Sequence, residues 1–255
     1  MVLLRDGLTG RPYELPTAQR RGLLRLRVHL APGGRGVDAA DVRALLVADV
    51  LLRALEAQGV QVLHALAGAG LSADRARTLR DAMAGLNIRP PDGDGGADIA
   101  PADAHVSAGP ASEDAPGAWI TVGAVTQDTP PVWRADGVPG GDGTDPLALR
   151  LALLAAPYRT PVALGPDALR DAGRTLAAWR RAVARWADSP SRPVPAAVAA
   201  SADAALADDL GTPGVLDVLR EVEADDAIPD GARFETFALL DRVLGLELSR
   251  DVGRA

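Results

Sequence analysis

The chain of 255 residues contains no lysine and no cysteine. Without an ammonium side chain it cannot build the phosphate sites that use lysine as a point charge, and without thiolates it cannot build cysteine zinc sites. Disulfides and thiol catalysis are excluded as well. Any chemistry must therefore come from arginine, aspartate, glutamate and three histidines. The bias toward alanine, arginine and glycine is typical of a GC-rich coding sequence, which accounts for the missing lysines on the surface.

From the sequence we expect neither a secretory signal nor a membrane span. The first ten residues include Arg5 and Asp6, which interrupt any apolar core of a signal peptide. No run reaches the roughly 18 apolar residues that a membrane helix needs. With a net charge of −7, the chain is unsuited to coating nucleic acid, although a local basic patch remains possible. We expect a cytoplasmic protein with no membrane partner.

The first third of the chain shows an α/β pattern. Residues 23–30 and 60–66 are predicted strands, and residues 38–58 and 72–86 are predicted helices. Asp38 and Asp41 have the spacing of a capping box, and Ser72 is the expected N-cap of the second helix. Residues 1–86 thus predict a partial Rossmann-like βαβα unit.

The middle of the chain predicts little regular structure. Residues 87–117 are rich in proline, glycine, aspartate and alanine, so we expect a linker there. Residues 118–145 are expected to add one strand, 118–125, and a loop that complete the α/β unit. Residues 146–255 show helical periodicity throughout and predict a C-terminal helix bundle.

One helix of this last region has two distinct faces. In the predicted helix 166–188, arginines recur on one stripe while leucine, valine and tryptophan occupy the opposite side. A solvated surface is one interpretation, and a face that follows the phosphates of RNA is the other. The candidate nucleic-acid contacts are Arg150, Arg159, Arg170, Arg174, Arg181 and Arg185.

Four segments carry a family resemblance, in the order in which the family has them. They are LRDGLTGR at 4–11, VRALLVADVLLRAL at 42–55, DPLALRLALLAAPYRT at 145–160 and DDLGT at 208–212. Together they resemble the cysteinyl-tRNA synthetases and the related mycothiol-pathway cysteine ligase, which are class I enzymes. The resemblance implies a Rossmann-like catalytic unit followed by helices, and an aminoacyl-adenylate reaction on ATP.

The departures from the family fall on its catalytic positions. The run that holds its zinc-binding cysteine corresponds to residues 30–33, LAPG. The HIGH-type tetrapeptide corresponds to Asp38–Asp41, DAAD, which places carboxylates where ATP is negatively charged. The family's KMSKS-type loop should lie between Val125 and Asp145. No lysine is available there, and Arg134 is the only basic residue of this stretch. The resemblance therefore predicts a degenerate, shortened relative with no catalytic residues.

Other sites are weakly indicated. The loop residues Gly33, Gly34, Arg35 and Gly36 precede a helix and, with Arg134, form a candidate nucleotide-binding remnant. The three histidines have no metal-ligand spacing, so we expect no metal and no cofactor.

Three functions remain open on these grounds. The first is a non-catalytic protein that binds tRNA or an acidic protein. The second is a residual aminoacyl or amide ligase that acts on ATP and an amino acid through Arg35 and Arg134. The third is a structural subunit that docks on itself or on a genuine synthetase.

Overall fold

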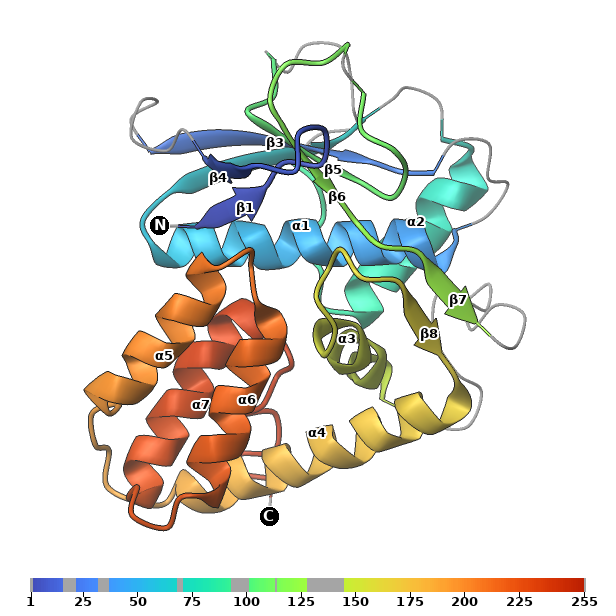
Figure 1. Ribbon diagram of the computed structural model, residues 1–255. Coiled ribbons are helices and arrows are strands. Elements are labelled where there is room, and N and C mark those ends of the chain that lie inside the picture. The colour runs from blue at the N-terminus through green and yellow to red at the C-terminus, as the bar shows by residue number, and fades with distance from the viewer. Residues whose placement is uncertain are drawn as a thin grey trace.

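We describe a computed structural model of the chain, which covers residues 2–15, 22–31, 37–67, 71–92, 101–112, 114–127 and 145–254. The helices are α1 (Ala39–Ala57), α2 (Ala73–Gly85), α3 (Pro146–Leu154), α4 (Pro166–Trp186), α5 (Ala196–Ala207), α6 (Thr212–Ala224) and α7 (Asp230–Leu244). The strands are β1 (Leu3–Arg5), β2 (Pro12–Glu14), β3 (Leu23–His29), β4 (Gln61–Leu66), β5 (Ala104–Ser107), β6 (Ala118–Thr121), β7 (Val125–Gln127) and β8 (Val162–Leu164). The main sheet and the first two strands lie at one end of the molecule, helices α4 to α7 lie at the other, and β7 and β8 lie at the side between them (Figure 1).

The main sheet has four parallel strands in the order β4-β3-β5-β6. Strand β3 alternates between buried and half-buried residues, and its buried side, Leu24, Leu26 and Val28, belongs to the core cluster that includes α1. Helix α1 begins at the predicted capping box, and α2 begins at Ser72, whose side chain accepts a hydrogen bond from the backbone N–H of Arg75. The parallel sheet and its crossover helices are consistent with the predicted Rossmann-like unit.

The prediction for residues 87–117 needs a correction, because this segment contains strand β5. All four residues of β5 are buried, and the strand lies between β3 and β6 at the centre of the sheet. Its sequence, AHVS, has neither a long apolar run nor a large side chain to mark it. A short strand hydrogen-bonded on both sides needs little intrinsic propensity, so tertiary pairing decides its conformation.

The predicted strand 118–125 is also wrong in one respect. It divides into β6, which ends at Thr121, and β7, which begins at Val125. Strand β7 leaves the main sheet and pairs in parallel with β8. The N-terminal hairpin of β1 and β2 is a third, antiparallel sheet.

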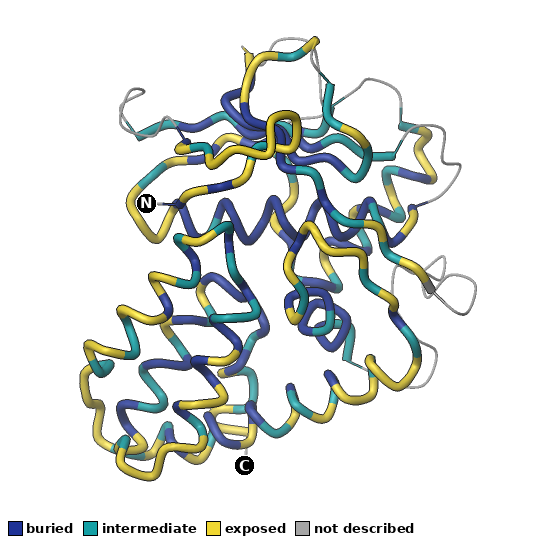
Figure 2. The backbone as a smooth tube through the Cα atoms, viewed as in Figure 1, coloured by how far each residue is buried: buried dark blue, intermediate teal, exposed yellow. Residues whose placement is uncertain are grey.

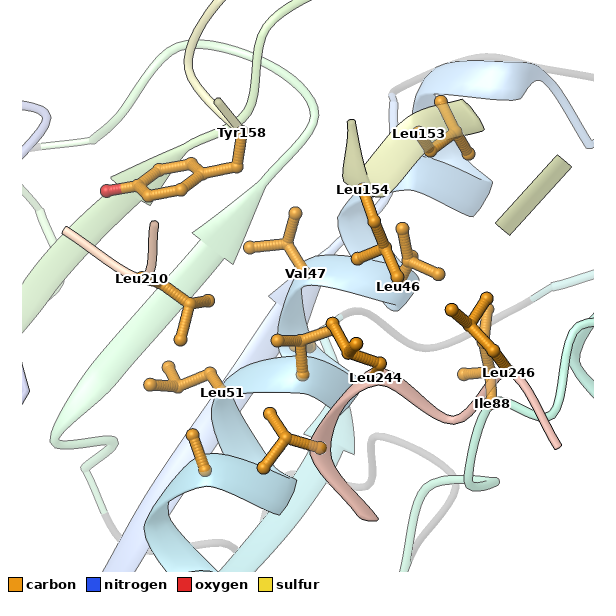
Figure 3. Packing of buried hydrophobic residues seen from close by; sticks show 14 of the residues in the cluster. Leu46, Val47, Leu51, Ile88, Leu153, Leu154, Tyr158, Leu210, Leu244 and Leu246 are labelled. Atoms are coloured by element: carbon orange, nitrogen blue, oxygen red, sulfur yellow. The ribbon is translucent and has the colours of Figure 1, made fainter. Parts of the chain in front are cut away.

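Helix α1 connects the sheet to the helices. Its sides away from the sheet contact the other half of the core, where Leu46, Val47 and Leu51 lie among leucines of α3 and of the segment after α7 (Figure 3). Figure 2 shows that the helix is buried along most of its length. A helix whose apolar residues are spread over most of its surface is expected at such an internal position. Each leucine fully buried here contributes roughly 1.5–3 kcal/mol.

The C-terminal half is mostly helical, as its periodicity predicts, but it is not helical throughout, because Val162–Leu164 forms strand β8 and pairs with β7. Helix α4 packs on α3 and α7, while α5, α6 and α7 contact one another. Trp179 and Trp186 lie on the inner side of α4 and meet Phe237 edge-on, with ring centroids 5.9 and 5.1 Å away. None of the helices in the described ranges has both the length and the apolar character needed to cross a membrane.

Candidate functional site

The candidate site is the carboxyl edge of the main sheet. From β3 the chain passes through α1 to β4 on one side, and it later returns to β5 on the other side. Open parallel sheets bind ligands outside their carboxyl edge at such a switch point, here between β3 and β5. The residues at this edge include His29 at the end of β3, Ala31 just after it, and Ser107 at the end of β5.

The N-terminus of α1 faces this edge and is capped by the chain itself. The backbone N–H of Asp41 donates to Oδ1 of Asp38 at 2.8 Å, and the N–H of Asp38 lies 3.5 Å from Oδ2 of Asp41. The Asp41 carboxylate also accepts from the N–H of Ala31 at 2.7 Å and is completely buried. Two carboxylates thus occupy the positive end of the helix dipole, which other proteins offer to phosphate.

Arg75 of α2 completes this closure. Its Nη2 lies 2.8 Å from Oδ2 of Asp41 and donates to the carbonyl of Ala31 at 3.2 Å. The arginine side chain is 10% exposed and the carboxylate is not exposed at all. An internal ion pair therefore ties α2, the N-terminus of α1 and the end of β3 together.

A pair of histidines lies on the sheet face opposite α1. Nε2 of His29 and Nδ1 of His105 are 2.9 Å apart, and Nε2 of His105 is 3.1 Å from the carbonyl of Pro116. The His105 ring stacks on Trp119, with centroids 4.5 Å apart. The pair therefore joins β3, β5, β6 and the loop between the last two strands.

The hydrogen-bond chain fixes the tautomers of both rings when they are neutral. A carbonyl only accepts, so Nε2 of His105 must donate to Pro116 and its Nδ1 must accept. His29 then donates from Nε2, which leaves a lone pair on its Nδ1. Burial, the nearby His105 and Arg27 lower the pKa of His29 to about 4, and burial also lowers the pKa of His105. At neutral pH the edge thus presents an uncharged hydrogen-bond acceptor.

Several predicted site residues lie outside the described part of the chain. These are Gly33, Gly34, Arg35 and Gly36 of the glycine loop, and Arg134. The nucleotide-binding remnant they were expected to form therefore stays a prediction.

Arg150 is not a nucleic-acid contact, and this prediction is wrong. Its side chain is 0% exposed, and its Nη2 is 2.7 Å from Oδ2 of Asp49 in α1. It also donates to the carbonyls of Leu86, Asn87 and Leu244. Its position on α3 turns it toward the junction of α1, the end of α2 and the end of α7, where no phosphate can reach it.

The other five arginines are accessible to different degrees. Arg159 is 38% exposed and lies 3.5 Å from a carboxylate oxygen of Asp209. The four arginines of the predicted stripe on α4 are exposed (Arg170, Arg174, Arg181 and Arg185). The first two pair with aspartates three residues earlier in α4. For Arg181 and Arg185 no ion pair with a described residue is found.

Sequence reasoning missed Arg75 and the histidine pair. Arg75 is one of several arginines on an ordinary surface-like helix, and only its position beside Asp41 distinguishes it. His29 and His105 are 76 residues apart, and His105 was expected in a linker. Within the described ranges no group of three or more histidine, aspartate or glutamate side chains could hold a metal ion.

Comparisons with known proteins support the family resemblance. No family model matches the chain. Curated relatives are named L-cysteine:1D-myo-inositol 2-amino-2-deoxy-alpha-D-glucopyranoside ligase. The one from Geodermatophilus obscurus is 50% identical over 76 residues, which are 30% of this chain and 17% of that protein. The one from Thermobispora bispora is 41% identical over 107 residues, or 41% of this chain and 25% of that protein.

A third such ligase, from Acidothermus cellulolyticus, is 39% identical over 106 residues, or 42% of this chain and 25% of that protein. The chain thus spans a quarter or less of the length of these three relatives. The predicted resemblance to the cysteine ligases related to cysteinyl-tRNA synthetases is confirmed over this part of the chain.

Proposed function

We propose that this chain is a synthetase-like protein that no longer forms an adenylate and that functions by binding a polyanionic partner, either tRNA or an acidic protein surface. The similarity to cysteine ligases supports an inherited scaffold. In this proposal the α/β unit has a structural role. The helical C-terminal half forms a bundle that presents a basic face.

The observation that carries the loss of adenylate formation is the closed N-terminus of α1. A nucleotide phosphate at this edge would need the N–H groups of the first helical turn and a positive potential. Asp38 already accepts from one of these N–H groups, and Asp41 forms an ion pair with Arg75. The Asp38 carboxylate at the phosphate position opposes a further negative group, and Asp41 already engages Arg75. The chain also has no lysine to offset this charge.

The ligase activity in the relatives' name is the competing function. It would require ATP and an amino acid to bind at the same edge. The test is pyrophosphate exchange with ATP across the standard amino acids, together with calorimetric titration of ATP into the purified chain. We expect neither exchange nor heat of binding, because of the two carboxylates. Amino-acid-dependent exchange would contradict the proposal and establish a residual ligase.

The binding half of the proposal depends on α4. Arg181 and Arg185 expose guanidinium groups that no described carboxylate neutralises. Such groups bind phosphate by displacing counterions, so that affinity falls steeply with salt. A shift assay with tRNA at several salt concentrations tests this. We expect binding that weakens with salt, and tRNA binding with no salt dependence would contradict a phosphate-binding face.

A second titration of the same purified chain distinguishes an acidic protein partner from tRNA. If tRNA does not shift, a polyglutamate peptide titrated in its place should bind through α4 with a similar salt dependence. Failure of both probes would refute the polyanion proposal. Co-purification with a synthetase would instead favour the structural-subunit function.

A further inference from the structure

A groove lies where the C-terminal end of α1 meets α5 and α7. It has a volume of about 390 Å³. Four alanines contribute to its lining (Ala54, Ala57, Ala199 and Ala202) together with aliphatic side chains of α5 and α7 (Leu206, Leu239, Leu240 and Val243). The hollow exists because alanines stand where larger side chains would fill the space between the helices.

One large apolar side chain stands at this groove with little cover. Leu239 of α7 is 41% exposed, whereas its neighbour Leu240 is 5% exposed. The groove therefore combines an apolar projection with an apolar hollow on the same surface. Helix α5 beside it has the sequence AAVAASADAALA, so another helix can approach its backbone closely.

The charged residues at the groove are of opposite sign and unpaired. Asp203 on α5 and Arg242 on α7 line it, and neither side chain has an ion-pair partner in the described part of the chain. Other charged residues of the helical half form pairs within the chain, for example Arg220 with Asp217 and Arg250 with Glu247. Both groups are free to bind a charge from another molecule.

We propose that this surface is a self-association interface, and that its occupant is a second copy of this chain related by a two-fold axis. In a two-fold interface, a residue that contacts another on the partner is contacted in return by the equivalent residue. Leu239 of each copy then enters the alanine-lined hollow of the other. Asp203 of each copy pairs with the other copy's Arg242. A surface with a projection, a hollow and two unpaired opposite charges is complementary to itself.

Sedimentation velocity of the full chain between about 1 and about 100 μM tests the proposal, since micromolar dissociation constants fall in that range. We expect a concentration-dependent dimer. Leu239→Glu places a charge in the hollow and should raise the dissociation constant at least ~10-fold. Leu63→Glu is the matched control, because Leu63 is 42% exposed on β4 of the main sheet and its replacement should leave the dimer unchanged.

Charge reversal separates specific pairing from general effects on folding. Asp203→Arg alone and Arg242→Glu alone each set like charges against each other across the axis, and each should weaken the dimer ~10-fold or more. The chain with both reversals regains opposite charges and should recover to within about 3-fold of the native affinity. A native chain that remains monomeric at the highest concentration overturns the proposal. So does a double reversal that dimerises no better than the single ones.

Discussion

Arg150 and Asp49 form an ion pair in the centre of the molecule. Arg150 Nη2 and Asp49 Oδ2 are 2.7 Å apart, and the two side chains are 0% and 1% exposed. Oδ2 of Asp49 also accepts from Arg53, and its Oδ1 accepts from the backbone N–H of Arg89. The pair joins α1 to α3 at the point where the ends of α2 and α7 converge.

Replacing Asp49 is therefore expected to be costly. Asp49→Asn leaves the Arg150 guanidinium buried without its carboxylate, and breaking a buried pair in this way costs about 3–5 kcal/mol. Urea unfolding followed by circular dichroism measures the loss. Arg170→Ala is the control, because its ion pair is at the surface and contributes about 0–1 kcal/mol. Equal losses of stability in the two variants would show that the buried pair contributes no more to stability than the surface pair.

The histidine pair predicts a dependence of stability on pH. The pKa of His29 is lowered from 6.5 to about 4 by burial, by His105 and by Arg27. Between these values the unfolded chain binds a proton that the folded chain does not, so the free energy of unfolding falls as the pH drops from about 6.5 to about 4. Allowing for solvent screening of the partly buried ring, we expect His29 to account for ~1–2 kcal/mol of this loss.

The measurement is urea unfolding of the native chain and of His29→Gln at pH 7, 5.5 and 4.5. Glutamine can still donate to His105 but does not titrate in this range. The loss of stability on acidification should be smaller in the variant than in the native chain. Identical losses would mean that His29 is protonated as easily in the folded chain as in the unfolded one.

Two glycines should respond in opposite ways to alanine. A Cβ at Gly123 would lie 2.5 Å from the carbonyl carbon of Thr160 and 2.6 Å from the carbonyl oxygen of Arg159. Arg43 holds the same stretch of backbone, because its Nη1 donates to the carbonyl oxygens of Gly123 and Thr160 at 2.8 and 2.7 Å. Gly123→Ala must move this backbone, and we expect a loss of ~2 kcal/mol or more.

Gly173 lies within α4, and the nearest atom to an added Cβ there is 3.7 Å away. Gly173→Ala should therefore stabilise the chain by about 0.5–1 kcal/mol, because alanine loses less backbone entropy in a helix. Thermal unfolding of the two variants beside the native chain gives both values. A melting temperature that is lower for Gly173→Ala would show that the helix is less regular than described.

The tRNA proposal predicts a difference between the two ends of the arginine stripe. Arg181→Ala combined with Arg185→Ala removes two guanidinium groups that have no partner among the described residues. The slope of log affinity against log salt should fall by about 1–2. Arg170→Ala combined with Arg174→Ala is the matched control and should change it less, since neighbouring aspartates already neutralise these groups. A larger effect of the control pair would exclude the proposed face.

The helices of this chain were predictable because their signals are local. The capping box at Asp38 and the N-cap at Ser72 mark the beginnings of α1 and α2, and both are present. The faces of α4 follow from a 3.6-residue period, and its tryptophans are buried while its arginine stripe is exposed. The candidate site was not predictable in the same way. Its described residues, Asp41, Arg75, His29 and His105, come from separate elements.

By itself, then, the sequence determined the identity and the approximate limits of the helices, the early parallel strands and the absence of lysine and thiol chemistry. Those features depend on residues within a few positions of one another or on composition alone. Tertiary structure decided that AHVS at β5 is a central strand, that Arg150 is buried beside Asp49, and that Arg75 closes the edge of the sheet. Each of these depends on which distant segment lies alongside, and burial and pairing across the fold outweigh local preference there.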